Sequence, residues 1–304
     1  MRTLLSLTVL LLTACGVSQA ELNDPGSELG SDEGELSASS RSYVVLRHDT
    51  MRRCPWPRCG GVFVHDVNRA SVRETYVYGL DFSTSTLTEE QQVQVMSAGA
   101  SEMVLHGKLG PVETNGFRRF QVTTAWRGMP GVKFTTADSF YRVAPASIQC
   151  LVAPCPSLRA TKLNSTSTTL HHDLDVGRAS MTAVDQNWLT FRVTDKDALV
   201  AGRFVEGATV NGTKEQVLDA SQVFLKIPDM TQSCGRPAIA RCPDGKVNLW
   251  TRDENRCTMP AGCGGGGACA AVVPACAEGY TLMSWTGGPF GCTQYACDPA
   301  FLFE

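Results

Sequence analysis

The residues most able to form covalent bonds or bind metal in this chain of 304 residues are its 13 cysteines. Twelve of them follow residue 50, and an even number can pair completely. In an exported protein, an even and regularly spaced set of cysteines indicates a disulfide framework, whereas the same set in a cytosolic chain suggests zinc binding. We therefore expect disulfides among Cys54, Cys59, Cys150, Cys155, Cys234, Cys242, Cys257, Cys263, Cys269, Cys276, Cys292 and Cys297.

Two short cysteine loops have matching spacing. Cys54 and Cys59 enclose four residues, as do Cys150 and Cys155, and prolines lie within both loops. Redox-active dithiols usually enclose two residues at the start of a helix, which lowers the pKa of the attacking thiol. We expect structural staples, each stabilising by roughly 2 kcal/mol. A redox pair and bridging between the two loops are the alternatives.

The last eight cysteines form a doubled pattern. The first four enclose 7, 14 and 5 residues, and the second four enclose 6, 15 and 4. Trp250 corresponds to Trp285, and glycines 264 to 267 lie between the halves as an expected hinge. The doubling predicts two small modules, each closed by its own disulfides. Zinc is the alternative, although C-x2-C hooks are absent and no histidine follows His172.

The thirteenth cysteine, Cys15, ends a different motif. An apolar run from Leu4 to Leu12 follows Arg2, and the small residue Ala14 precedes the cysteine. The run is too short for about 30 Å of bilayer, so residues 1–14 are expected to be a removed leader. The motif resembles the lipobox of bacterial lipoproteins, which implies lipid such as palmitate on Cys15. Because Gly16 is not aspartate, the resemblance implies a Gram-negative outer membrane. Ordinary secretion with a free thiol is the alternative.

Charge is distributed unevenly along the chain. Residues 15–41 contain six acids before the first base, Arg41, and few large apolar residues, so we expect a disordered tether. Its root-mean-square span would be roughly 25 to 30 Å. Residues 42–304 contain 24 acids and 25 bases. This balance predicts no basic face, and therefore no nucleic-acid partner and no polybasic site for anionic lipid.

Residues 42–230 contain an internal duplication. When the sequences of the two short cysteine loops are aligned, several later residues also align: Asn68 with Asn164, Leu80-Asp81 with Leu174-Asp175, Gly107 with Gly202, and Asn115-Gly116 with Asn211-Gly212. We expect a first β-rich repeat over 42–138, a second over 139–230, and a cysteine-rich module of two four-cysteine repeats over 231–304.

The elements expected in each repeat are mainly strands. Runs of β-branched and aromatic residues at 43–46, 62–64, 104–106 and 140–143 predict strands. Each Asn-Gly pair predicts a hairpin. One helix is expected from Thr88 to Ala98, with Gln91 completing a capping box. The predicted fold class is all-β, or β-rich α+β, with a duplicated β domain before a small disulfide-rich module.

No catalytic motif accompanies these elements. The sequence lacks G-x-S-x-G, H-E-x-x-H, a P-loop and a dinucleotide fingerprint. The five histidines are scattered, and the one cluster, His171-His172-Asp173, is expected in a solvated loop. We predict no catalytic residues, no metal and no cofactor, and these absences favour a protein that is not an enzyme.

The stretch CPWPRCGGVFVHDVN, with FYRV and CLVAPCPSLRATKLN further along, resembles an uncharacterised domain family of myxobacterial lipoproteins and secreted proteins. The resemblance spans about 42–229 and implies export and a β-rich fold, without an activity. The tail is loosely similar to antistasin-type inhibitor repeats, although its cysteine spacing departs from theirs.

The leading hypothesis is a non-enzymatic lipoprotein of the cell envelope, with a binding or structural role. Its partners would be the membrane, through lipid on Cys15, and a protein or glycan of the envelope. Loops held on a rigid scaffold are where recognition usually resides. The alternatives are a protease inhibitor acting through the tail and an envelope hydrolase with an unrecognised site.

Overall fold

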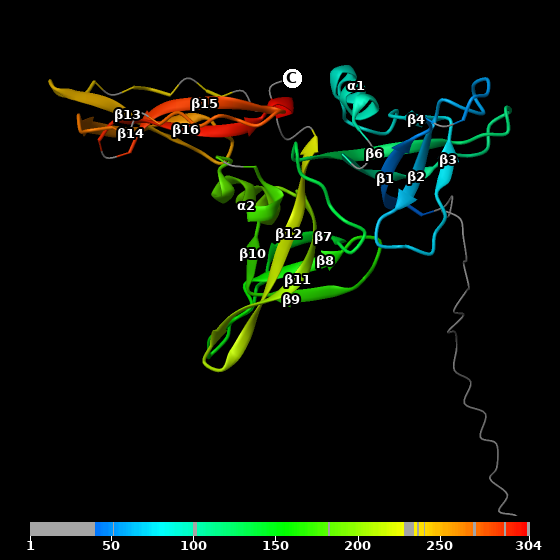
Figure 1. Cartoon of the computed structure of the whole chain (residues 1–304), viewed down its shortest axis with the longest axis horizontal. Helices are drawn as coiled ribbons and strands as arrows, with labels where there is room; N and C mark the ends of the chain where they lie inside the picture. Colours follow the sequence, from blue (N-terminus) through cyan, green and yellow to red (C-terminus); the bar gives the residue numbers. More distant parts are fainter. Residues whose placement is uncertain are drawn as a thin grey trace, which may run out of the picture. The chain divides into compact units, whose positions relative to one another are not determined.

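Strands form in the first half of the chain where buried and half-buried residues alternate, as in β1 and β2. The computed structural model describes residues 40–50, 52–99, 102–181, 183–227, 234–235, 237–239, 241–269, 272–288 and 290–302; the predicted leader, Cys15 and the tether to residue 39 lie outside them. The elements of this half are β1 (Ser42–His48), β2 (Val62–Asp66), β3 (Thr75–Val77), β4 (Gly79–Asp81), α1 (Glu89–Ser97), β5 (Met103–Leu109) and β6 (Arg119–Gly128) (Figure 1).

The expected helix is confirmed with its cap. The Thr88 side chain accepts a hydrogen bond from the Gln91 backbone, and the Gln91 side chain accepts one from the Thr88 backbone. This reciprocal arrangement satisfies two donors that a helix start otherwise leaves unpaired. Val95 of α1 packs into the core of the first half.

The second half repeats this order of elements. They are β7 (Ser139–Pro145), β8 (Leu158–Lys162), β9 (Thr168–His171), β10 (Asp173–Asp175), the 3-10 helix η1 (Gly177–Ala179), α2 (Gln186–Asp195), β11 (Leu199–Val210) and β12 (Thr213–Ile227). Helix α2 was not expected. It begins at Asp185, whose side chain accepts a hydrogen bond from the Trp188 backbone.

The two halves also share their strand pairings. In the first half β1 pairs with β2 and β5, β2 with β3, and β5 with β6, all antiparallel, while β4 runs parallel to β6. In the second half β7 pairs with β8 and β11, β8 with β9, and β11 with β12, while β10 runs parallel to β12. The predicted β-rich fold class is therefore confirmed.

One antiparallel contact joins the halves into a single 12-stranded sheet. Gly128 of β6 pairs with Phe224 of β12, and reciprocally Trp126 pairs with Lys226. Equivalent residues exchange roles across this contact, as they do at a two-fold interface between identical subunits.

Two asparagines make a second reciprocal contact between the halves. The Asn68 side chain donates to the Phe140 and Leu163 carbonyls, at 2.8 and 3.0 Å, and accepts from the Phe140 backbone N–H at 2.8 Å. The Asn164 side chain makes the equivalent three bonds with Tyr43 and with the carbonyl of Val67. Each half thus holds the first strand of the other.

Three buried clusters fill the space around the sheet. One is formed mainly by the first half and includes α1. Another is formed mainly by the second half, includes α2, and takes in Cys297 and Phe301 of the tail. The third draws on both halves through Trp126, Phe140 and Phe224. Aromatic rings whose centres lie 5.8 Å apart, as in Phe140 and Phe224, contribute packing beyond their buried area.

Both predicted hairpins are confirmed. Asn115-Gly116 lies in the connection between the paired strands β5 and β6. Asn211 and Gly212 form the two-residue turn between β11 and β12, with φ of 51° and 78°. Two positive φ values in succession define the tight hairpin turn for which Asn-Gly is preferred.

The matched glycines Gly107 and Gly202 also have equivalent roles. The register of each strand shifts at its glycine, which is a β-bulge. A Cβ on Gly107 would overlap the Gln121 carbonyl oxygen, and one on Gly202 would overlap the Asp219 carbonyl oxygen. Only glycine fits because the neighbouring backbone lies so close.

The tail consists of two hairpins, drawn in orange and red in Figure 1. They are formed by β13 (Lys246–Arg252) with β14 (Thr258–Gly265), and by β15 (Tyr280–Gly287) with β16 (Cys292–Pro299), before η2 (Ala300–Leu302). The expected glycine hinge is wrong in part, because Gly264 and Gly265 pair with β13 as the end of β14.

Candidate functional site

All twelve expected cysteines form disulfides in the structure. The pairs are Cys54–Cys59, Cys150–Cys155, Cys234–Cys257, Cys242–Cys263, Cys269–Cys292 and Cys276–Cys297. In each four-cysteine module the first pairs with the third and the second with the fourth, with the same separations of 23 and 21 residues. These twelve cysteines therefore leave no thiol free for zinc.

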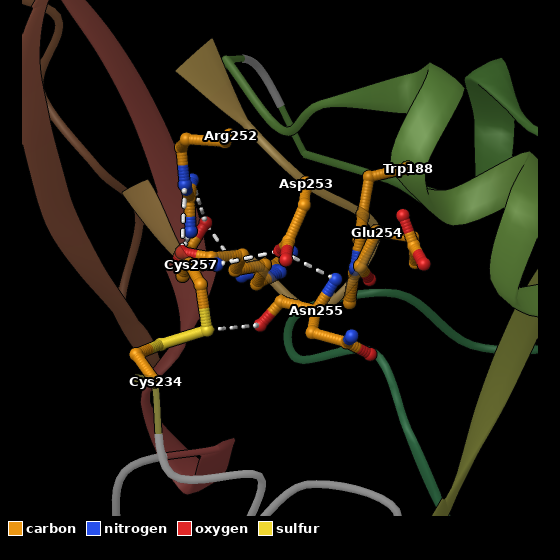
Figure 2. Close-up of a disulfide and its surroundings, with 9 residues drawn as sticks. Trp188, Cys234, Arg252, Asp253, Glu254, Asn255 and Cys257 are labelled. Carbon is orange, nitrogen blue, oxygen red and sulfur yellow. Dashed lines mark hydrogen bonds and ion pairs between the residues drawn. A yellow bond between two sulfur atoms is a disulfide. The ribbon is translucent and has the colours of Figure 1, made fainter. Parts of the chain in front are cut away.

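Cys257 ends a turn that fastens the tail to α2 (Figure 2). Asp253 accepts hydrogen bonds from the backbone N–H groups of Asn255 and Cys257, at 2.9 and 2.8 Å. The shaped turn presents the Glu254 carbonyl to the Trp188 indole N–H at 3.1 Å. This disulfide region is structural.

A buried ion cluster lies beside the same turn. Asp298 is fully buried and pairs with Arg252 at 2.6 Å and with Arg256 at 2.5 Å. The Arg256 guanidinium also stacks on the Trp188 ring, 3.2 Å from its centre. Burial lowers the pKa of Arg256, and the Asp298 carboxylate opposes that shift. Since both arginine side chains are less than 10% exposed, this cluster offers nothing to a ligand.

The Cys54–Cys59 loop differs from the tail because it presents a large side chain to solvent. Trp56 is 66% exposed, and its ring forms a T-shaped pair with Tyr78, with 5.5 Å between ring centres. The backbone of the loop is held by the disulfide and by the Tyr76 hydroxyl, which donates a hydrogen bond to the Pro57 carbonyl at 2.8 Å. Residues 55–58 and 115–117 line an open hollow of about 540 Å³.

Arginines stack on aromatic rings beside this loop. Register places Arg47, Phe63 and Tyr76 opposite one another across β1, β2 and β3. The Arg47 guanidinium lies 4.3 Å from the Phe63 ring centre, and that of Arg52 lies 4.1 Å from the Tyr76 ring centre. We call this surface the arginine–aromatic face; its members are Arg47, Arg52, Trp56, Arg58, Phe63, Tyr76, Phe117 and Arg119, with the buried Tyr78 packed against Trp56 and Arg119.

Three acids hold some of these arginines in place. Glu74 binds Arg47, Asp49 binds Arg52 at 2.8 Å, and Glu113 lies 3.4 Å from Arg119. Hydrogen bonds from the arginines lower the pKa of the Glu74 and Asp49 carboxyls, which stay ionised. The three arginine side chains nevertheless remain 42–47% exposed.

The chain segments that supply this face are richer in arginine than in acidic residues. The segments that form it, 47–63, 73–78 and 113–119, contain seven arginines and three acids. Among the described residues, no ion pair involves Arg53, Arg58, Arg73 or Arg118. The face itself has four arginines beside three acids, and the expectation of no basic face for nucleic acid stays a prediction.

The second half does not carry this face. The positions equivalent to Arg47, Phe63 and Tyr76 are occupied by Ala144, Arg159 and Leu170, which also face one another across three strands. The equivalent cysteine loop exposes Leu151 and Val152 instead of a tryptophan. The arginine–aromatic face is therefore specific to the first half.

The remaining cavity of interest lies at the junction of the halves. It measures about 400 Å³ and is lined in part by His65, Asp66, Asp138 and Lys162. Asp138 is already engaged, since it accepts hydrogen bonds from Thr135 and Ser221. Burial raises the pKa of Asp66. No described serine or threonine hydroxyl that lines this cavity bonds a histidine, so it lacks a nucleophile–base pair.

The histidine cluster is not the expected solvated loop. His171 is fully buried on β9 against Phe204, with ring centres 5.5 Å apart. His172 accepts a hydrogen bond from the Gln216 backbone at 2.9 Å. Within the described part of the chain, no group of three His, Cys, Asp or Glu side chains could hold a metal ion, and no helix is long and apolar enough to cross a membrane.

Sequence comparison defines the class to which this duplicated, disulfide-stapled β domain belongs. Residues 42–230 match the family described as "Domain of unknown function (DUF6748)", and because this is more than half of the chain, the protein belongs to that family. An uncharacterized protein of Dictyostelium discoideum is 29% identical over 191 residues, which cover 62% of this chain and 64% of the relative. No solved structure matches. Since the relative is an amoebal protein, the similarity indicates neither a bacterial source nor a lipoprotein.

Proposed function

We propose that this protein is an exported, lipid-anchored binding protein of the cell envelope, and that it recognises its partner through the arginine–aromatic face. The observation that carries the proposal is the loop closed by Cys54 and Cys59, which holds Trp56 66% exposed beside stacked arginines. Tryptophan and arginine are the side chains most enriched at binding hot spots. A loop already fixed before binding loses less entropy when a partner arrives.

Export is supported by the six disulfides, because such bonds persist in oxidising compartments. They use twelve cysteines and leave Cys15 as the remaining one. Its place after a small residue and a short apolar run supports modification by lipid, with residues 16–41 as the spacer to the folded domain. Two or three acyl chains would anchor the protein stably.

Binding is favoured over catalysis by the chemistry of the face. Arginine side chains and aromatic rings bind anions and flat apolar surfaces, whereas hydrolysis needs a positioned nucleophile and base. The tail places Cys297 and Phe301 in the core of the second half, which favours a structural role for the tail over protease inhibition.

Mass spectrometry of full-length protein purified from membranes tests the proposal. We expect loss of residues 1–14, a diacylglycerol adduct on Cys15, and no alkylation of the other cysteines without reductant. The Cys15→Ser variant should lose the adduct and leave the membrane fraction. A retained leader, or thiols that alkylate freely, would show that the protein is not an exported lipoprotein.

A further inference from the structure

We propose that the arginine–aromatic face binds an acidic polysaccharide, with a sugar ring on Trp56 and its acidic groups on the arginines. This inference rests on the binding role proposed above and names its ligand class. Residues 42–304 are nearly neutral, with 24 acids and 25 bases, yet the three segments of the face carry seven arginines and three acids. Such a concentration of one sign attracts a polyanion.

The arginine of the face that has no acidic partner among the described residues, Arg58, is the one most able to bind a ligand. A guanidinium lying flat on an aromatic ring uses its face for that contact, while its N–H groups point outward in the plane. The Arg47 and Arg52 guanidinium groups lie 4.3 and 4.1 Å from ring centres, and their N–H groups already bind Glu74 and Asp49. Arg58 lines the hollow next to Trp56. A carboxylate of the polymer can therefore bind the planar fork of Arg58 with two hydrogen bonds. Arg53 and Arg73, which are exposed and form no ion pair among the described residues, add positive charge.

Trp56 and the hollow supply the site for a sugar ring. The C–H bonds on one side of a pyranose carry partial positive charge, and the face of an indole carries negative charge, so the two attract. The hollow of about 540 Å³ is open, as a polymer that continues in both directions requires.

The same features argue against insertion into a bilayer. Membrane-docking loops present several apolar side chains to the acyl region. Among the described residues of the three segments, Trp56 is the one large apolar side chain that is mostly exposed. The rings of Phe63, Tyr76 and Tyr78 lie beneath arginines, and that of Phe117 packs against Tyr76. A single tryptophan beside separate arginines matches a polysaccharide whose sugar rings alternate with acidic groups.

Binding of full-length protein in detergent to polygalacturonate tests the inference, with neutral dextran as the comparison polymer. We expect binding to polygalacturonate that weakens as salt rises, and none to dextran. Trp56→Ala and Arg58→Gln should each weaken binding about tenfold, which corresponds to about 1.4 kcal/mol. Both side chains are exposed, so the melting temperature should not change.

The second half offers matched controls. Leu151→Ala truncates an exposed residue of the equivalent loop, and Arg159→Gln removes an exposed arginine at the position equivalent to Phe63. Both variants should bind as the unmodified protein does. Equal loss in variants and controls, or equal binding of dextran, would overturn the inference.

Vesicles containing phosphatidylglycerol, mixed with protein that carries Cys15→Ser so that no acyl chain inserts into the bilayer, separate this inference from the proposal on which it rests. If Trp56→Ala and Arg58→Gln abolish vesicle binding while polygalacturonate never binds, the polysaccharide is wrong although the binding face stands. If neither probe depends on these residues, the binding face itself is wrong. The mass of the amino terminus reports on the lipid anchor independently of either result.

Discussion

The reciprocal asparagine contacts give the sharpest test of how the two halves are held together. Asn68→Ala removes three hydrogen bonds of 2.8 to 3.0 Å with the backbone of Phe140 and Leu163. At about 1 kcal/mol for each bond, the loss is about 3 kcal/mol. Asn68 also has a φ of 63°, where alanine is strained by roughly 1 kcal/mol more. We expect a total of about 4 kcal/mol.

Two further substitutions at Asn68 separate these contributions. Asn68→Gly tolerates the positive φ but restores no hydrogen bond, so it should cost about 3 kcal/mol. Asn68→Asp keeps the acceptor for the Phe140 N–H but turns a carboxylate oxygen toward two carbonyl oxygens. It should therefore destabilise at least as much as alanine does.

Guanidinium unfolding of the oxidised protein, monitored by tryptophan fluorescence, measures these differences in the free energy of unfolding. Asn164→Ala should match Asn68→Ala, because its side chain makes the equivalent bonds. Asn115→Ala is the control, since its side chain accepts one bond at an exposed turn, from the Phe117 N–H. If glycine restores most of the stability, or aspartate costs less than alanine, the hydrogen bonds do not hold the halves together.

Two further predictions concern buried charge. Asp298→Asn should lower the free energy of unfolding by roughly 3–5 kcal/mol, because Arg252 and Arg256 would stay buried without a counter-charge; denaturant titration measures this, and a loss below about 1 kcal/mol would contradict it. Burial lowers the pKa of His171 and of His106, so below an unfolded pKa of about 6.5 the unfolded chain binds protons that the folded chain does not. Stability should therefore decline as pH falls from about 6.5 toward the folded pKa values, and His171→Leu should make that decline shallower between pH 7 and 5. An unchanged slope would rule out His171 as a contributor.

Local patterns accounted for several elements of the fold. The Thr88–Gln91 capping box and the Asn211-Gly212 turn are each specified by neighbouring residues, and both form as expected. Helix α2 was missed because its third residue is Trp188, which cannot complete a capping box. The alignment of the two halves could have predicted α2. When the residue numbers of α1 are raised by the spacing between Asn68 and Asn164, they fall on α2.

The arginine–aromatic face could not be found in this way. Arg47, Arg52 and Arg119 are separated by up to 72 residues, and the sequence also places acids between them. A count of charge over residues 42–304 does not reveal these arginines, because acids elsewhere in the chain balance them. The pairing of β1 with β2 and of β2 with β3, and the approach of residues 115–117 to the Cys54–Cys59 loop, bring them onto one surface.

The sequence by itself determined the features that depend on covalent chemistry and near neighbours: twelve cysteines that can pair, turns that need positive φ, and helix caps. Only the tertiary structure decided which cysteines of the tail pair, which asparagine holds which strand, and where exposed charge collects. The physical reason is the distance along the chain between the residues that interact. A turn or cap is stabilised within a few residues, whereas the contacts of Asn68 with Phe140 and Leu163 span 72 and 95 residues and exist only once the sheet has formed.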